Sequence, residues 1–234
     1  MVLSVIGGKG RMGSIVVKEA KKDKDIKKVY VCDIDTENFE QSLVDTDVYI
    51  DFSKAGVINS YIEKISQDRR ALVCGTTGLS EQDFTVLKKY SNKIPIFYSP
   101  NMSIGVFLTT KVIAMLTKAW TGDIEIMEIH HRHKKDSPSG TAKRLFEEIN
   151  KIKKFNAVFR TEGKDLKKMD EIGISSIRGG DVIGEHTVYF FEEGERIEIK
   201  HIATDRKIFA RGAIRAAKFI KGKEAGFYSM GDIL

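Results

Sequence analysis

The segment from His130 to Thr141 concentrates side chains that can transfer protons and bind an anion. It reads His130-His131-Arg132-His133-Lys134-Lys135-Asp136-Ser137-Pro138-Ser139-Gly140-Thr141. A reductase that adds hydride to an electron-poor carbon must also deliver a proton to the partner atom, and Lys or His can supply it when burial and neighbours adjust its pKa. The first half of the segment therefore predicts acid–base chemistry in a nicotinamide-dependent reductase.

The second half of the same segment predicts an anion site. Pro138-Ser139-Gly140-Thr141-Ala142 has the composition of a helix start, with Ser139 or Thr141 at its beginning. Backbone N–H groups at a helix start, together with the two hydroxyls, would hold a carboxylate. A proton donor next to an anion clamp indicates a small acidic substrate.

Two other interpretations of the segment stay open. In the first, the histidines merely end a strand and Ser139 is an ordinary N-cap. In the second, His131, His133 and Asp136 bind a metal ion. Two histidines without a clear third ligand make a poor zinc site, and the neighbouring Lys and Arg side chains oppose a cation. We therefore expect no metal here, and the whole constellation favours the catalytic interpretation.

A strand must position these side chains. Residues 123–131 have a strand pattern, in which successive side chains point to opposite faces, so His130 and His131 should diverge. Two more strands, 187–191 and 196–202, flank a short turn that contains Gly194, which predicts a hairpin. We expect an open mixed sheet in this half of the chain.

A glycine-rich loop predicts a second site. Gly7-Gly8-Lys9-Gly10-Arg11-Met12-Gly13 follows a strand at 2–6 and opens a helix. Its glycine spacing is wider than the usual dinucleotide fingerprint, but a tight turn, a close backbone approach and a helix start can still be supplied. A structural turn is the alternative interpretation.

Asp33 strengthens the dinucleotide interpretation. It ends the second predicted strand, where an acid would bind a ribose hydroxyl. An acid disfavours a 2′-phosphate and Ile34 adds no cation, although Lys9 and Arg11 could offset the repulsion. We expect NADH, with NADPH use left open.

Two further turns follow strands and should lie at the carboxyl edge of the same sheet, where ligands bind. They are Gly75-Thr76-Thr77-Gly78 and Ser99-Pro100-Asn101-Met102. Their small or hydroxyl residues would let a nicotinamide ring approach the backbone.

Alternating strands and helices in the first half predict parallel βαβ units. The predicted helices are 12–20, 56–66 and one that Ser80 opens, with Asp83 completing a capping box. The predicted strands are 2–6, 28–32, 48–52, 71–74 and 96–98. Later in the chain we expect a helix from Ser139 or Thr141, a charged and irregular surface segment at 153–171, and an amphipathic helix at about 207–221. The predicted fold class is α/β: a Rossmann-like dinucleotide-binding domain and an α+β substrate domain with an open mixed sheet.

Composition narrows the class of protein. The 234 residues are 41% hydrophobic and 31% charged, with a formal charge of +6. Basic residues are interleaved with acidic ones, so we expect no nucleic-acid partner. No apolar run approaches a membrane span and no leader is visible, which predicts a cytoplasmic protein without a membrane partner.

The two cysteines fall in apolar strands and are expected to be buried free thiols. Because an open sheet needs a cover for its apolar face, we expect a homo-oligomer.

The chain closely resembles the dihydrodipicolinate reductase family over nearly its whole length. The His130–Ala142 segment is very specific to that family, whereas the glycine loop alone is not. The other matching segments are 7–13, Asp51-Phe52-Ser53, 75–78, 101–106, 178–186, 209–213 and 226–230.

The resemblance implies hydride transfer from NADH or NADPH to a cyclic imine dicarboxylate in lysine and diaminopimelate biosynthesis. His130 and Lys134 would be the acid/base pair, with Lys134 as the expected proton donor. The implied dicarboxylate ligands are His131, Ser139, Gly140 and Thr141. The implied cofactor ligands are residues 7–12 (Gly7, Gly8, Lys9, Gly10, Arg11, Met12), Asp33, Phe52, Gly75, Thr76, Thr77, Ser99, Pro100, Asn101 and Met102.

The resemblance also implies domains and an assembly. Residues 1–103 and 206–234 would form the dinucleotide-binding domain, and residues 104–205 the substrate-binding and oligomerisation domain, with hinges near 103 and 206. The assembly would be a homotetramer joined through the sheets of the substrate domain. Ile34 departs from the basic residue that many relatives carry, and Met102 replaces a common aromatic. Another imine or keto-acid reductase, or a non-catalytic nucleotide-sensing protein, are the alternatives.

Overall fold

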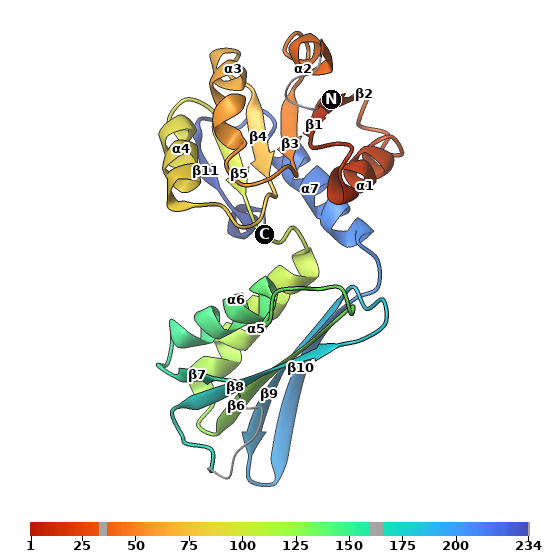
Figure 1. Cartoon of the computed structure of the whole chain (residues 1–234). Helices are drawn as coiled ribbons and strands as arrows, with labels where there is room; N and C mark the ends of the chain where they lie inside the picture. Colours follow the sequence, from red (N-terminus) through yellow and green to blue (C-terminus); the bar gives the residue numbers. More distant parts are fainter. Residues whose placement is uncertain (33–36, 160–165, 234) are drawn as a thin grey trace. The chain divides into compact units, whose positions relative to one another are not determined.

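The structure is a computed structural model that describes residues 1–32, 37–159 and 166–233 (Figure 1). The chain divides into two compact units. One contains Met1–Ile104 and Arg206–Leu234, and the other contains Gly105–Asp205.

The first unit contains a six-stranded parallel sheet, as the βαβ pattern predicted. The strand order is β11-β5-β4-β3-β1-β2. The strands are β1 (Val2–Ile6), β2 (Lys28–Cys32), β3 (Val48–Asp51), β4 (Ala71–Cys74), β5 (Pro95–Tyr98) and β11 (Gly226–Tyr228). The chain passes from β1 outward to β2 and then returns to β3 on the other side of β1. The loops after β1 and β3 therefore meet at the point where ligands bind in such sheets.

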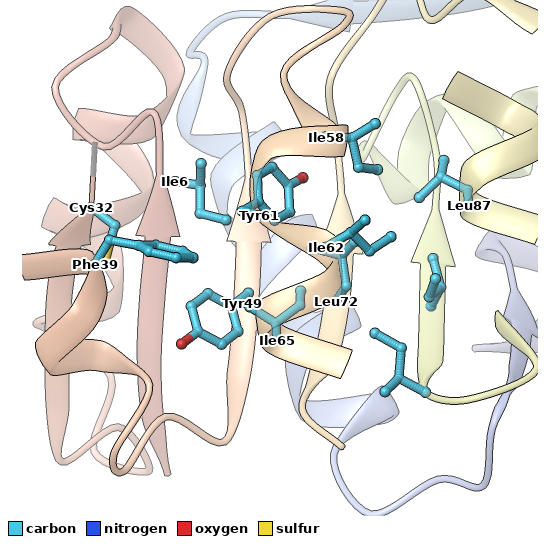
Figure 2. Packing of buried hydrophobic residues seen from close by; sticks show 12 residues of the cluster. Ile6, Cys32, Phe39, Tyr49, Ile58, Tyr61, Ile62, Ile65, Leu72 and Leu87 are labelled. Atoms are coloured by element: carbon cyan, nitrogen blue, oxygen red, sulfur yellow. The ribbon is translucent and has the colours of Figure 1, made fainter. Parts of the chain in front are cut away.

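Helices cover both faces of this sheet. On one face, α1 (Arg11–Ala20) packs against α7 (Lys207–Ile220), and α7 contacts β3, β4 and β5. On the other face lie α2 (Glu37–Ser42), a 3-10 turn at Ile58–Ser60, α3 (Ile62–Gln67) and α4 (Glu81–Ser91). Figure 2 shows the core on this second face, where Phe39, Tyr49, Tyr61 and Leu72 are buried.

Two predictions for these helices had different outcomes. The capping box of Ser80 and Asp83 at the start of α4 is confirmed. The single helix predicted at 56–66 is wrong, because the segment forms a 3-10 turn followed by α3. Tyr61 separates the two pieces with φ −131°, outside the helical region, and its hydroxyl donates to Asp51.

The second unit contains a five-stranded mixed sheet, as expected, in the order β10-β9-β6-β8-β7. Its strands are β6 (Asp123–His130), β7 (Asn156–Val158), β8 (Glu171–Arg178), β9 (Gly184–Glu192) and β10 (Glu195–Ala203). β6 pairs with β8 in parallel and with β9 in antiparallel orientation. The β9–β10 hairpin is confirmed, with Gly194 at φ +85° in its turn.

The segment 153–171 was predicted to be irregular, and this is wrong for β7, which pairs with β8 at the edge of the sheet. A strand of three residues is too short to show a hydrophobic period.

Two helices, α5 (Ile104–Ala119) and α6 (Gly140–Asn150), pack on one face of the mixed sheet (Figure 1). Ile113 and Leu145 of these helices are buried against Ile126 and Val188 of the sheet. Further along β6 the same face becomes polar, because Glu128 and His130 follow Ile126 at alternate positions. The core thus ends where the segment from His130 to Thr141 begins.

Both cysteines, Cys32 and Cys74, are buried and free, as expected. Within the described ranges, no helix is long and apolar enough to cross a membrane.

Candidate active site

His130 lies at the end of β6 with its side chain in the interior. It is 8% exposed, and its Nδ1 lies 2.5 Å from Oε2 of Glu128, two residues earlier on the same face of the strand. His131 follows the strand and is only partly buried, with its backbone N–H donating to the Val182 carbonyl. The two adjacent histidines therefore occupy different environments.

Glu128 is fully buried and accepts hydrogen bonds from three parts of the unit. Besides His130, it accepts two bonds from Arg178, Nη1 to Oε2 at 2.8 Å and Nη2 to Oε1 at 2.6 Å, and one from the Ser139 N–H at 3.1 Å. Burial alone would raise the pKa of Glu128, but the hydrogen bonds from His130 and Arg178 outweigh burial and hold that pKa well below its usual range. Glu128 is a fixed negative charge beneath the site.

Arg178 ends β8 and reaches across the parallel pair to Glu128. Its Nη2 also donates to the Asp136 carbonyl at 2.8 Å, which ties the loop carrying Lys134 to the sheet. Sequence reasoning missed both Glu128 and Arg178 as site residues. Two features of the sequence could have indicated them. Glu128 is an acid at a strand position whose neighbours in the pattern are apolar, and Arg178 opens the 178–186 segment that matches the family.

Lys134 lies in the loop between β6 and α6. Its side chain is 19% exposed, and its Nζ donates to Asp136 Oδ1 at 2.7 Å. Burial opposes ionisation of Asp136, but the Lys134 hydrogen bond and charge lower the pKa of that carboxyl overall. The Lys134 ammonium group is thus held by a carboxylate of its own loop, two residues further on.

Ser139, one of the two residues predicted to start the helix, is the N-cap of α6, and its hydroxyl faces the interior. Ser139 is 2% exposed, its Oγ accepts from the Ala142 N–H at 3.2 Å, and Nε2 of His186 lies 2.9 Å from the same oxygen. Gly140 is exposed and Thr141 is partly exposed at the first turn of the helix. The first-turn backbone, rather than the Ser139 hydroxyl, is the part of this cap that lies at the surface.

His186, on β9, is a second buried histidine that sequence reasoning missed. Burial, followed by the neighbouring His130, lowers its pKa to about 3, so its ring is neutral near pH 7. The rings of His186 and His130 lie edge to face with centroids 5.1 Å apart. The sequence feature that could have indicated His186 is its position at the end of the 178–186 segment, which matches the family.

The glycine loop of the first unit has the close packing that a pyrophosphate cradle needs. Gly7 has φ +72°, and a Cβ there would lie 2.9 Å from the Phe52 carbonyl. A Cβ on Gly13 would lie 2.1 Å from the Gly7 carbonyl, so α1 can approach the loop only without a side chain at 13. Gly10 caps α1 without a side-chain hydrogen bond, and Lys9, Gly10 and Arg11 are exposed. This loop fits a dinucleotide.

The turns after β3 and β4 pack against each other. Gly75 lies against the Phe52 ring, since a Cβ there would be 2.6 Å from the ring carbons. Thr76 is buried and its hydroxyl donates to Asp51 at 3.1 Å, whereas Thr77 is exposed. Asp51, which was not predicted as a site residue, also accepts from the Tyr61 hydroxyl at 2.8 Å and the Ser53 N–H at 2.8 Å.

The remaining predicted cofactor residues divide by burial. Ser99 is buried and donates to the Asn101 carbonyl at 2.6 Å, and Asn101 accepts from the Ser103 N–H. Pro100 is exposed, but Met102 is 1% exposed and lies in the interior beside Gly212. Asp33 and Ile34 lie outside the described residues.

Among the residues that the structure describes, no group of three or more His, Cys, Asp or Glu side chains could hold a metal ion.

A parallel six-stranded sheet with a glycine loop after its first strand, accompanied by a separate mixed-sheet unit, defines a two-unit NAD(P)-dependent oxidoreductase. Two family models match the chain: dihydrodipicolinate reductase, N-terminus, over residues 1–102, and dihydrodipicolinate reductase, C-terminus, over residues 105–234. The chain belongs to the dihydrodipicolinate reductase family.

Individual relatives are similar to this chain in sequence over nearly their full length. The 4-hydroxy-tetrahydrodipicolinate reductase of Aquifex aeolicus is 43% identical, with 98% of this chain and 97% of the relative covered. That of Archaeoglobus fulgidus is 40% identical, with 100% of both chains covered. A solved structure, the dipicolinate-bound dihydrodipicolinate reductase from Paenisporosarcina sp. TG-14, has a TM-score of 0.81 at 20% identity and covers 100% of this chain and 99% of its own. This structural likeness confirms the fold class.

Proposed function

We propose that the chain reduces 4-hydroxy-tetrahydrodipicolinate with NADH or NADPH, a step of lysine and diaminopimelate biosynthesis. The observation that carries the proposal is the set of hydrogen bonds that joins the parts of the His130–Thr141 segment. Glu128 binds His130 and the Ser139 N–H at the start of α6, and Arg178 binds the loop that carries Lys134. Full-length relatives that bear this activity in their names support it.

The residues proposed to hold the nicotinamide cofactor lie on the loops after β1, β3, β4 and β5, and Asp33, which follows β2 in the sequence, is added to them. They are Gly7–Met12, Asp33, Phe52, Gly75–Thr77 and Ser99–Met102. When bound, the cofactor supplies the hydride. In this set, Gly7 and Gly8 allow close approach of backbone, and Gly75 leaves room for the Phe52 ring. Thr76 fixes its turn through Asp51, and Met102 supports its turn from the interior.

The residues proposed to act on the substrate lie in the second unit. Lys134 donates the proton, and His130 takes part in acid–base exchange. His131 and the first turn of α6 at Gly140 and Thr141 bind a carboxylate, and the positive end of the helix favours that charge. Ser139 holds the start of the helix in place through its buried cap.

One assay tests the proposal. Freshly prepared 4-hydroxy-tetrahydrodipicolinate should cause oxidation of NADH or NADPH, each followed at its absorbance, and a panel of other imines and keto acids should not. No oxidation with this substrate would refute the proposal, and oxidation only with another imine or keto acid would favour the alternative reductase. NADH binding without any oxidation would favour a nucleotide-sensing protein.

The role of Lys134 has its own test. Lys134→Ala should lower kcat severely while NADH affinity stays nearly unchanged, and Lys135→Ala, an exposed neighbour of the same type, is the matched control. Equal losses of turnover and NADH affinity would contradict the assigned role.

Cofactor choice is tested at Asp33. Asp33→Ala should weaken NADH binding more than NADPH binding, because the acid is proposed to bind the ribose hydroxyl that carries the phosphate in NADPH. An unchanged ratio of the two affinities would remove Asp33 from the site.

We further propose a cytoplasmic homotetramer joined through the mixed sheet. Exposed apolar side chains at Ile177 and Ile202, on β8 and β10, support an interface there. Light scattering coupled to gel filtration should report four chains, and a monomer would contradict this assembly.

A further inference from the structure

One ion pair, between the buried Glu128 and the partly buried Arg178, contacts three parts of the proposed substrate-binding segment. Glu128 contacts the His130 ring and the Ser139 N–H, and Arg178 contacts Glu128 and the Asp136 carbonyl. These are the proposed acid–base histidine, the cap of the proposed carboxylate-binding helix, and the loop that carries Lys134. A charge pair in the interior is costly unless its hydrogen bonds are satisfied, and both oxygens of this carboxylate are.

The geometry fixes the protonation state of Glu128. Both carboxylate oxygens accept from the Arg178 fork, Oε1 from Nη2 and Oε2 from Nη1, and guanidinium groups only donate. A proton on either oxygen would point at an N–H group. Glu128 is therefore an ionised acceptor at both oxygens.

The state of Glu128 in turn fixes the tautomer of His130. Because Oε2 can only accept, Nδ1 of His130 must carry a hydrogen and donate it. In the neutral ring, Nε2 then carries the lone pair. Nε2 is the nitrogen that a Cβ at position 184 would approach to 2.9 Å, so Gly184 leaves space beside it.

Arg178 has two functions in this arrangement. Its positive charge balances the negative charge of Glu128. The carboxylate that orients the His130 ring is therefore already paired with a cation. Through Nη2 Arg178 also holds the Asp136 carbonyl, two residues after Lys134. A lysine at this position could supply the charge but not the fork that reaches both groups.

We propose that Glu128 and Arg178 are positioning residues. They set the Nδ1–H tautomer of His130 and fix the Lys134 loop and the start of α6 relative to each other. The proposal rests on the function proposed above for His130 and Lys134. Neither Glu128 nor Arg178 is proposed to touch the substrate.

The tautomer can be measured in the unmodified protein. In ¹⁵N-histidine-labelled enzyme, with the His130 signals assigned by their loss in His130→Asn, we expect the neutral His130 ring to carry its hydrogen on Nδ1 and none on Nε2. A predominant Nε2–H tautomer would overturn the proposal, and this result needs no activity and no folded variant of Glu128.

Two variants extend the test. Glu128→Gln replaces one accepting oxygen by an amide N–H. When this N–H faces His130, it shifts the His130 tautomer; when it faces Arg178 Nη2 and the Ser139 N–H, it breaks the hydrogen bonds to both. The substitution should also lower kcat about 10- to 100-fold, the range expected from one charge-assisted hydrogen bond, with little change in KM for NADH. Arg178→Lys should leave the tautomer largely in place but raise KM for the dicarboxylate, since the loop and the helix start lose their common anchor.

Glu125→Gln is the matched control, because Glu125 lies on the same strand and binds Lys167 and the Gly173 N–H away from His130. It should change neither the tautomer nor kcat. If circular dichroism shows that Glu128→Gln is folded, and the variant retains the wild-type tautomer and kcat, the proposal is wrong. If the wild-type protein shows the Nδ1–H tautomer but oxidises no NADH with the substrate, the proposed function fails while the structural part of this inference stands.

Discussion

The hydroxyl of Ser139 and the ring of His186 form a buried contact between the start of α6 and strand β9, with Oγ 2.9 Å from Nε2. Oγ accepts from the Ala142 N–H, so the helix cap and the sheet share one oxygen. The cap is therefore held by the sheet and is not a feature of the helix alone.

The buried state of His186 predicts a pH dependence of stability. Its pKa is lowered to about 3, mainly by burial, against 6.5 for an ordinary histidine. As pH falls below 6.5 the unfolded chain binds a proton that the folded protein does not, so the free energy of unfolding should fall, by about 2 kcal/mol at pH 5. Urea unfolding at a series of pH values measures this slope.

His186→Asn should flatten that slope, and His133→Asn, at an exposed histidine, is its control. Burial also lowers the pKa of His201, so part of the slope should remain. Glu128 acts in a lower window, because its lowered pKa removes stability only as pH falls below 4.5. An unchanged slope in His186→Asn would show that His186 is not the group responsible.

Gly184→Ala should displace the His130 ring. A Cβ at 184 would lie 2.9 Å from Nε2 of His130, which is closer than such atoms pack, and overpacking costs about 1–3 kcal/mol. We expect a lower kcat and a lower melting temperature. Gly179→Ala, where a Cβ meets nothing within 4 Å, should change neither. Equal effects of the two substitutions would rule out a specific effect on His130.

Gly13→Ala should separate α1 from the glycine loop. A Cβ there would lie 2.1 Å from the Gly7 carbonyl oxygen, so the backbone must move. We expect loss of NADH binding, followed by fluorescence titration, with destabilisation of about 1–3 kcal/mol. Ser14→Ala, at the next and exposed position of the same helix, should bind NADH normally; tight NADH binding by Gly13→Ala would mean that the loop geometry is not needed.

Asp51→Asn should weaken the turns after β3 and β4 together. Oδ2 of Asp51 accepts from Tyr61 and Thr76, and Oδ1 accepts from the Ser53 N–H; an amide cannot accept at both positions, so we expect a loss of about 1–3 kcal/mol and weaker NADH binding. Asp68→Asn, at an exposed position, is the control. Wild-type stability and NADH affinity in Asp51→Asn would show that this carboxylate does not brace the turns.

Local patterns predicted much of this fold. Strand alternation placed His130 and His131 in different environments, the Ser139 cap and the Ser80–Asp83 capping box followed from side-chain chemistry, and the turn at Gly194 located the hairpin. Each of these features depends on residues close in sequence. The helix predicted at 56–66 failed because Tyr61 forms a long-range contact with Asp51 that no local period contains.

The candidate site was predicted only where its residues are contiguous. Arg178 meets Glu128 because β6 and β8 pair in parallel, with His130 opposite Arg178, and that register is set by packing over a long sequence separation. His186 enters in the same way, opposite Glu128 on β9. The buried orientation of Met102 and Thr76 likewise depends on what packs around them, which composition does not reveal.

The placement of α7 and β11 in the first unit has a consequence for biosynthesis. Ala213, Ala217 and Ile220 of α7 are fully buried, and β11 completes the sheet beside β5, yet both elements come from the end of the chain. The second unit is continuous in sequence and all its strands precede residue 206. On the ribosome, the second unit can therefore close its core first, while the first unit must wait until residues 207–228 have emerged.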